Sequence, residues 1–156
     1  MRSPLFAAVL FLVAVAPPAF AGAAEDAALA PVHHFVDSVN AGDMKGAAAA
    51  YAPEASIIDE FAPYRWQGPR AYAGWLADFE AKSKAQGLTE PMMTLLKPTR
   101  VVVSGDHAYA VLPALYDFKL KGKPIREFGT FSFALTKTME GWRIAAWGWA
   151  WAWDTQ

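Results

Sequence analysis

The sequence contains no cysteine. This absence excludes disulfide bonds, thiolate metal ligands and the lipidated cysteine of a lipoprotein anchor. The chain also lacks an excess of basic charge, because 14 lysine and arginine residues oppose 15 aspartate and glutamate residues. Nucleic acid is therefore not an expected partner.

Motifs of several enzyme classes are missing as well. The sequence has no Gly-x-Ser-x-Gly nucleophile elbow, no phosphate-binding loop and no dinucleotide fingerprint. His33 and His34 are neighbours on a predicted helix and point about 100° apart, so they cannot both bind one metal ion. His107 lies in a predicted turn. We expect neither a metal nor a cofactor.

The first residues have the pattern of an exported protein. Arg2 precedes an uninterrupted apolar run over residues 5–16, and small residues suited to cleavage follow at 19–23. This pattern predicts a secretory signal peptide over residues 1–23 and a secreted or periplasmic mature domain over 24–156. The apolar run is shorter than the roughly 20 residues that a spanning helix needs, so we expect no stable membrane anchor after cleavage.

Three helices are predicted in the first half of the mature chain. The first carries an apolar stripe at helical spacing and ends at Asn40–Gly42. A second, short helix is expected over 47–51, capped by Asp43 and ended by Pro53. The third helix closes at Gly87. The stripes of the first and third helices are Val32, Phe35, Val36 and Val39, and Tyr72, Trp75, Leu76 and Phe79.

Beyond the third helix the chain contains only strand-like segments separated by turn residues. The strand-like segments of the whole chain cover 55–59, 92–97, 99–104, 108–120, 126–137 and 142–153. Helices followed by a run of long strands are typical of an α+β fold. We expect a cone-shaped, curved antiparallel sheet wrapped on about three N-terminal helices, with a cavity between the sheet and the helices.

Several local strings extend this interpretation. They are VNAGDMKGAAAAYAPEAS at 39–56, the helix start at Gly68-Pro69, and GWRIAAW at 141–147. On these strings the chain resembles the nuclear transport factor 2-like superfamily, specifically its SnoaL-like and ketosteroid-isomerase-like branch. The resemblance covers nearly all of residues 30–153 and implies the cone-shaped fold. It implies no single function, because this scaffold hosts isomerases, cyclases, hydrolases, dehydratases and non-catalytic proteins.

Asp59 is the candidate catalytic residue. In the ketosteroid-isomerase-like proteins that the chain resembles, the proton-shuttling aspartate stands at its position. Alternation along a strand would place only one of Asp59 and Glu60 in the cavity. Aromatic surroundings would raise the pKa of that carboxyl by desolvation, as a general base requires. The alternative is a structural carboxylate that caps backbone amides or pairs with Arg65.

The chain departs from those isomerases at the groups that hold the developing enolate. The tyrosine of the first helix is Phe35 here, and the acid of a late strand is missing from TFSFAL at 130–135. A general base without an oxyanion partner loses what is usually the largest catalytic contribution. Steroid isomerisation is therefore not expected.

Four tryptophans alternate at the end of the chain: Trp147, Trp149, Trp151 and Trp153. In a strand they would share one face, opposite a face of small residues. Such an indole face must be buried, either on the concave side around the cavity or beneath a second subunit, and membrane contact is a further alternative. The resemblance favours the concave side. A bulge near Gly148 would split the set between the two faces.

The remaining candidates come from an aromatic loop before the third helix, which either covers the cavity as a lid or fills the edge of the core. The predicted ligand-binding residues are Trp147, Trp149, Trp151, Tyr64, Trp66, Phe35 and Tyr116. The leading hypothesis is a small apolar or aromatic molecule bound in the cavity. The alternatives are an isomerase, cyclase or hydrolase that uses Asp59, and a non-catalytic homodimer whose Trp-rich sheet face is the interface. We also expect a homodimer as the oligomeric state.

Overall fold

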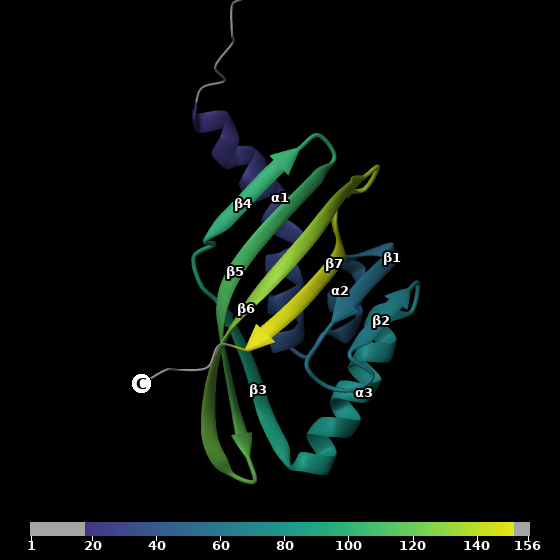
Figure 1. Cartoon of the computed structure of the whole chain (residues 1–156), viewed down its shortest axis with the longest axis vertical. Coiled ribbons are helices and arrows are strands. Elements are labelled where there is room, and N and C mark those ends of the chain that lie inside the picture. The colour runs from purple at the N-terminus through teal and green to yellow at the C-terminus, as the bar shows by residue number, and fades with distance from the viewer. Residues whose placement is uncertain (1–17, 152–156) are drawn as a thin grey trace, which may run out of the picture.

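The computed structural model describes the backbone of residues 18–151 and the side chains of residues 22–151 (Figure 1). Within these residues the elements are α1 (Pro18–Asn40), α2 (Met44–Ala49), β1 (Tyr51–Ile58), β2 (Arg65–Gly68), α3 (Ala71–Gln86), β3 (Leu88–Leu95), β4 (Arg100–Ser104), β5 (His107–Leu120), β6 (Lys123–Thr138) and β7 (Gly141–Trp151). Figure 1 shows α1 passing behind the curved sheet, with α3 beside β1 and β2. The predicted α+β class is confirmed.

The seven strands of this part of the chain form one open sheet in the order β2-β1-β7-β6-β5-β3, with β4 also paired to β5. One edge of β5 pairs with β4 along its first half and with β3 along its second half. The sheet was expected to be antiparallel, but β1 and β7 run parallel. These two strands are not joined by a hairpin, so nothing forces them into opposite directions.

The long β5–β6 hairpin sets the register on which the cavity depends. Its turn consists of Lys121 and Gly122, which have φ values of 50° and 81°. Positive φ at both positions matches the right-handed twist of the flanking strands. The turn pairs Leu120 with Lys123, and the same register places Tyr116 directly opposite Glu127.

The helix ends follow the local signals in the sequence. Asp43 caps α2, because its side chain accepts a hydrogen bond of 2.8 Å from the backbone N–H of Gly46. Gly87 ends α3 in the left-handed conformation, with a φ of 72°. The predicted end of α1 at Asn40 is confirmed.

The region between α2 and α3 differs from the prediction in two places. The second helix ends at Ala49, and Pro53 lies inside β1, where a register shift between Tyr51 and Ser56 interrupts the pairing with β7. Proline has no N–H to donate, so it is tolerated at such an irregularity. The aromatic loop was expected to be irregular, but its second half forms β2 against β1.

The predicted signal peptide lies largely outside the described residues, which begin at position 18. In α1 the side chains of residues 22–27 are exposed or partly exposed, and the buried stripe begins at Ala28. Removal of residues 1–23 would therefore leave the buried part of α1 intact.

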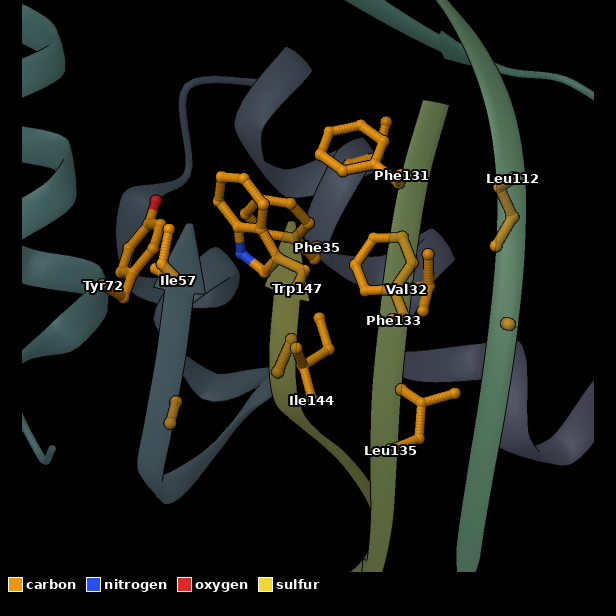
Figure 2. Close-up of a cluster of buried hydrophobic side chains, with 14 of the residues drawn as sticks. Val32, Phe35, Ile57, Tyr72, Leu112, Phe131, Phe133, Leu135, Ile144 and Trp147 are labelled. Carbon is orange, nitrogen blue, oxygen red and sulfur yellow. The ribbon is translucent and has the colours of Figure 1, made fainter. Parts of the chain in front are cut away.

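The core fills the space between α1 and the concave face of the sheet. Figure 2 shows Ile57, Trp147, Phe133 and Leu112 on four neighbouring strands, together with Val32 of α1. All five residues are at most 3% exposed. This burial is the main stabilising contribution in a chain without disulfides.

The tryptophan stripe of β7 faces this concave side. Trp147, Trp149 and Trp151 pair with Phe133, Phe131 and Gly129 of β6 in one uninterrupted register. The bulge lies earlier than suspected, at Ala145, because Ile144 and Ala146 pair with consecutive residues of β6. Gly148 therefore does not split the stripe, and Trp153 lies outside the described residues.

Candidate functional site

A cavity of about 220 Å³ lies between α1, α3 and the concave face of the sheet. Its lining is mainly aromatic and aliphatic, with a few charged and polar groups. The aromatic members are Phe35, Phe61, Trp75, Phe79, Tyr116, Phe118, Phe131, Trp147 and Trp149, and the polar members are Asn40, Asp59, Glu60, Lys82, Gln86 and Glu127. Apolar walls with few polar groups are typical of small-molecule sites.

Trp147 is the centre of the aromatic wall. Its ring lies 5.3 Å from Trp75 and 5.4 Å from Phe131, with edge-to-face angles of 84° and 81°. Its indole Nε1 donates a hydrogen bond of 2.6 Å to the hydroxyl of Tyr51. These contacts fix the plane of the indole, since edge-to-face pairs and a satisfied N–H both favour one orientation.

Trp149 forms the next part of the wall and depends on a glycine of the neighbouring strand. Its ring lies 4.6 Å from Phe131. A β-carbon at Gly129 would overlap the six-membered ring of Trp149. The indole thus occupies the space that a side chain at Gly129 would take.

Asp59 lies just beyond the end of β1 and is held by two donors. Its Oδ2 accepts a hydrogen bond of 2.7 Å from Trp75 Nε1, and its Oδ1 accepts one of 2.7 Å from the Glu60 backbone N–H. Burial raises the pKa of the Asp59 carboxyl, and the two hydrogen bonds and Lys82 partly offset that rise. The buried environment expected for Asp59 is therefore present. Of the two structural alternatives, the hydrogen bond from Glu60 matches a carboxylate that caps a backbone amide, whereas Arg65 bonds to Gln67 and not to Asp59.

Two further carboxylates and one ammonium group share this part of the lining. Burial raises the pKa of Glu127, as does the nearby charge of Glu60, whereas Lys82 lowers it. Lys82 also lies 4.7 Å above the ring centre of Phe61. Only one of Asp59 and Glu60 was expected in the cavity, but both line it. Strand alternation no longer applies there, because β1 ends at Ile58.

Asn40 anchors one wall of the cavity. Its side-chain amide donates to the carbonyl of Met93 at 2.8 Å and accepts from the Met93 N–H at 2.9 Å. Met93 belongs to β3, a strand at the edge of the sheet. The amide thus takes the place of a missing neighbouring strand and holds the end of α1 against β3.

The structure brings most of the predicted residues together. Asp59, Phe35, Tyr116, Trp147 and Trp149 all line the cavity. Their roles in binding or catalysis stay predictions. The burial of Trp147 within the single chain does not fit the alternative in which the indole stripe faces outward beneath a second subunit.

Three predicted residues lie outside the cavity lining. Trp66 is buried, but its Nε1 donates to Asp78 at 2.8 Å, so it packs against α3 at the edge of the core. Tyr64 and Trp151 are 61% and 42% exposed. The pairing of β2 with β1 holds Trp66 at this edge. Of the aromatic residues in the loop and strand before α3, Phe61 is the one that lines the cavity.

Several lining residues were missed by the sequence reasoning, most clearly Glu127 and Asn40. Glu127 and Asp117 lie on either side of the β5–β6 turn. Asp117 pairs across the strands with Arg126 at 2.6 Å, whereas Glu127 lines the cavity. The two-residue turn could have placed Glu127 in the cavity. Counting outward along both strands from the pair Leu120 and Lys123 puts Glu127 opposite Tyr116.

Other site types have no support in the described part of the chain. Residues 18–151 contain no group of three or more His, Asp or Glu side chains that would hold a metal ion. Among the same residues, no helix is both long and apolar enough to cross a membrane.

Known proteins with the same fold were found by structure. An NTF2-like protein with a cystatin-like fold from Novosphingobium aromaticivorans is 17% identical, with a TM-score of 0.68 over 88% of this chain and 87% of that one. An NTF2-like superfamily protein from Salmonella enterica is 16% identical, with a TM-score of 0.69 over 87% and 96%. A ketosteroid isomerase-like protein from Erwinia carotovora is 17% identical, with a TM-score of 0.65 over 83% and 97%.

These similarities establish the fold and leave the chemistry open, because identities of this size do not transfer function. No curated protein matches the sequence. The model of the SnoaL-like domain family matches residues 29–149. That range spans every element from the buried part of α1 to the stripe of β7, and the chain therefore belongs to the SnoaL-like domain family, within the NTF2-like fold.

Proposed function

We propose that this domain binds a small, flat, apolar or aromatic molecule in the cavity between α1, α3 and the sheet. The observation that carries the proposal is the fixed aromatic wall of Trp75, Phe131, Trp147 and Trp149 around a cavity of about 220 Å³. Flat rings stack favourably on such walls and gain from leaving water.

The charges of the lining narrow the class of ligand. Asp59, Glu60 and Glu127 are three carboxyl groups against the single ammonium group of Lys82. An anionic ligand would meet repulsion and lose its hydration. We therefore expect a neutral or cationic ligand, and a cation would also be attracted to the indole faces.

Calorimetric titration with methyl naphthyl ketone tests this proposal. We expect saturable binding to the wild-type protein. Val39→Phe places a larger side chain in the lining and should weaken binding by roughly tenfold or more, or about 1.4 kcal/mol. The matched control is Val102→Phe, at a position on β4 that is 42% exposed, and its affinity should equal that of the wild type. Equal loss in both variants, or no binding at all, would contradict the proposal.

A second candidate function is proton abstraction from a carbon next to a carbonyl, with Asp59 as general base. Its burial, its raised pKa and its place in the lining favour this role. Deuterium exchange at the methyl group of methyl naphthyl ketone, followed by NMR in heavy water, measures that step. Exchange that Asp59→Asn leaves unchanged would remove Asp59 as the base.

Export and dimerisation are proposals that rest on other parts of the chain. Val102, Tyr109 and Phe128 are 42%, 44% and 44% exposed on the convex face, where a second copy would cover them. Sedimentation over a range of concentrations, with Tyr109→Glu as the disruptive variant, tests the dimer.

N-terminal sequencing of protein expressed with its own leader tests cleavage within residues 19–23.

A further inference from the structure

Tyr116 carries a hydroxyl group that forms no hydrogen bond with the other residues of the cavity. It lies on the concave face of β5 and lines the cavity beside Phe118, with ring centres 5.0 Å apart. Its hydroxyl oxygen is buried and has no hydrogen-bond partner among the described residues. A buried hydroxyl without a partner is unfavourable, so a ligand that supplies a partner gains affinity.

Three N–H donors of the lining are already engaged. Trp75 donates to Asp59, Trp147 donates to Tyr51, and Asn40 donates to the backbone of Met93. The buried hydroxyl of Tyr116, in contrast, is a neutral donor that remains available for a ligand. Burial and the charges of Glu127 and Asp59 raise the pKa of Tyr116, so the hydroxyl keeps its proton.

The surroundings also decide whether Tyr116 donates or accepts. A hydroxyl or amine group on a ligand would find stronger acceptors in the carboxylates of Asp59 and Glu127, which lie near enough to influence Tyr116. These carboxylates only accept hydrogen bonds, so they cannot bind the oxygen of a ligand carbonyl. Tyr116 is thus suited to bind an acceptor oxygen.

We infer that Tyr116 is a specificity-determining residue whose hydroxyl donates a hydrogen bond to a carbonyl oxygen of the bound molecule. The ligand class is then a neutral, flat, apolar ketone or related carbonyl compound. This inference rests on the proposed function and deepens it. It also places a donor in the cavity, on β5, whereas Phe35, the aromatic residue that α1 contributes to the lining, has no donor group.

A pair of matched probes tests the inference. Methyl naphthyl ketone and isopropenyl naphthalene have the same shape and differ in a C=O group against a C=CH₂ group. Wild-type protein should prefer the ketone by about fivefold to tenfold, as one net hydrogen bond predicts. Tyr116→Phe should abolish this preference and keep its affinity for the hydrocarbon. Tyr109→Phe, exposed on the convex face, should keep the wild-type preference.

The stretching frequency of the bound ketone gives a second readout that a merely structural role would not move. The C=O band should lie lower in the wild type than in Tyr116→Phe. Equal probe affinities in the wild type, or a preference and frequency that Tyr116→Phe retains, would overturn the inference while leaving the proposed function standing. If the wild type binds neither probe, the proposed function fails and the inference fails with it.

Discussion

The six-membered ring of Trp149 lies in the space directly above Gly129, on the neighbouring strand. Gly129 is in the middle of β6, a position where glycine is otherwise unfavourable because it adds no packing. The missing side chain allows the indole to approach Phe131, with ring centres 4.6 Å apart, and to form one wall of the cavity.

Gly129→Ala should therefore move Trp149 and change the cavity. A methyl group at this position overlaps the indole, so we expect a loss of about 1–3 kcal/mol in the free energy of unfolding. The near-ultraviolet circular dichroism of the aromatic cluster should change as well. Gly148→Ala is the matched control, since a β-carbon there would make only ordinary contacts, 3.9 Å from Ile58. Equal effects of the two substitutions would refute this account of Gly129.

The hydrogen bond between Trp147 and Tyr51 gives a second prediction. Tyr51→Phe keeps the ring but leaves the indole N–H of Trp147 without its partner at 2.6 Å. Urea denaturation should show a loss of about 1–3 kcal/mol, which is the range for a buried donor left unpaired. Tyr109→Phe removes a hydroxyl from a side chain that is 44% exposed and should cost much less. A Tyr51→Phe variant as stable as the wild type would show that this bond does not order the wall.

The dependence of stability on pH tests the environment of Asp59. Its pKa is raised in the folded protein, so its contribution is fully present below the ordinary value of 3.8 and is lost as the pH rises through the folded pKa. Asp59→Asn should therefore be more stable than the wild type at neutral pH. The difference in the free energy of unfolding should shrink as the pH falls toward 3.8.

Asp117→Asn should behave in the opposite way. Hydrogen bonding to Arg126 lowers the pKa of Asp117, so the contribution of this carboxylate is present above the unfolded pKa and is lost on acidification. The asparagine variant should be less stable than the wild type at neutral pH and should match it in acid. Denaturation curves of the three proteins over a pH series separate the two signs. The same sign for both variants would be inconsistent with these environments.

Much of the fold was predictable because its signals are local. The capping carboxylate of Asp43 and the left-handed Gly87 set the ends of two helices through their immediate neighbours. Two-residue alternation correctly placed Trp147 and Trp149 on one face. The family resemblance added the expectation that this face is the concave one.

The parts that were missed depend on contacts distant in sequence. The short strand β2 forms only because β1 is present to pair with it. The side chain of Asn40 is held at the cavity by hydrogen bonds to the backbone of Met93 in the edge strand β3. Met93 is 53 residues away in the sequence. The bulge at Ala145 has no local signal that we recognise, yet it brings Ile144 and Trp147 to the same buried face.

The central claim is that a small aromatic molecule binds against the tryptophan wall, and the indole N–H signals of the protein test it most directly. These signals can be assigned by single Trp→Phe variants and followed by two-dimensional NMR during titration with methyl naphthyl ketone. We predict that the signals of Trp75, Trp147 and Trp149 shift together and saturate, while those of Trp66 and Trp142, which lie outside the cavity lining, stay in place. Signals that do not move, or shifts confined to Trp66 and Trp142, would contradict the account.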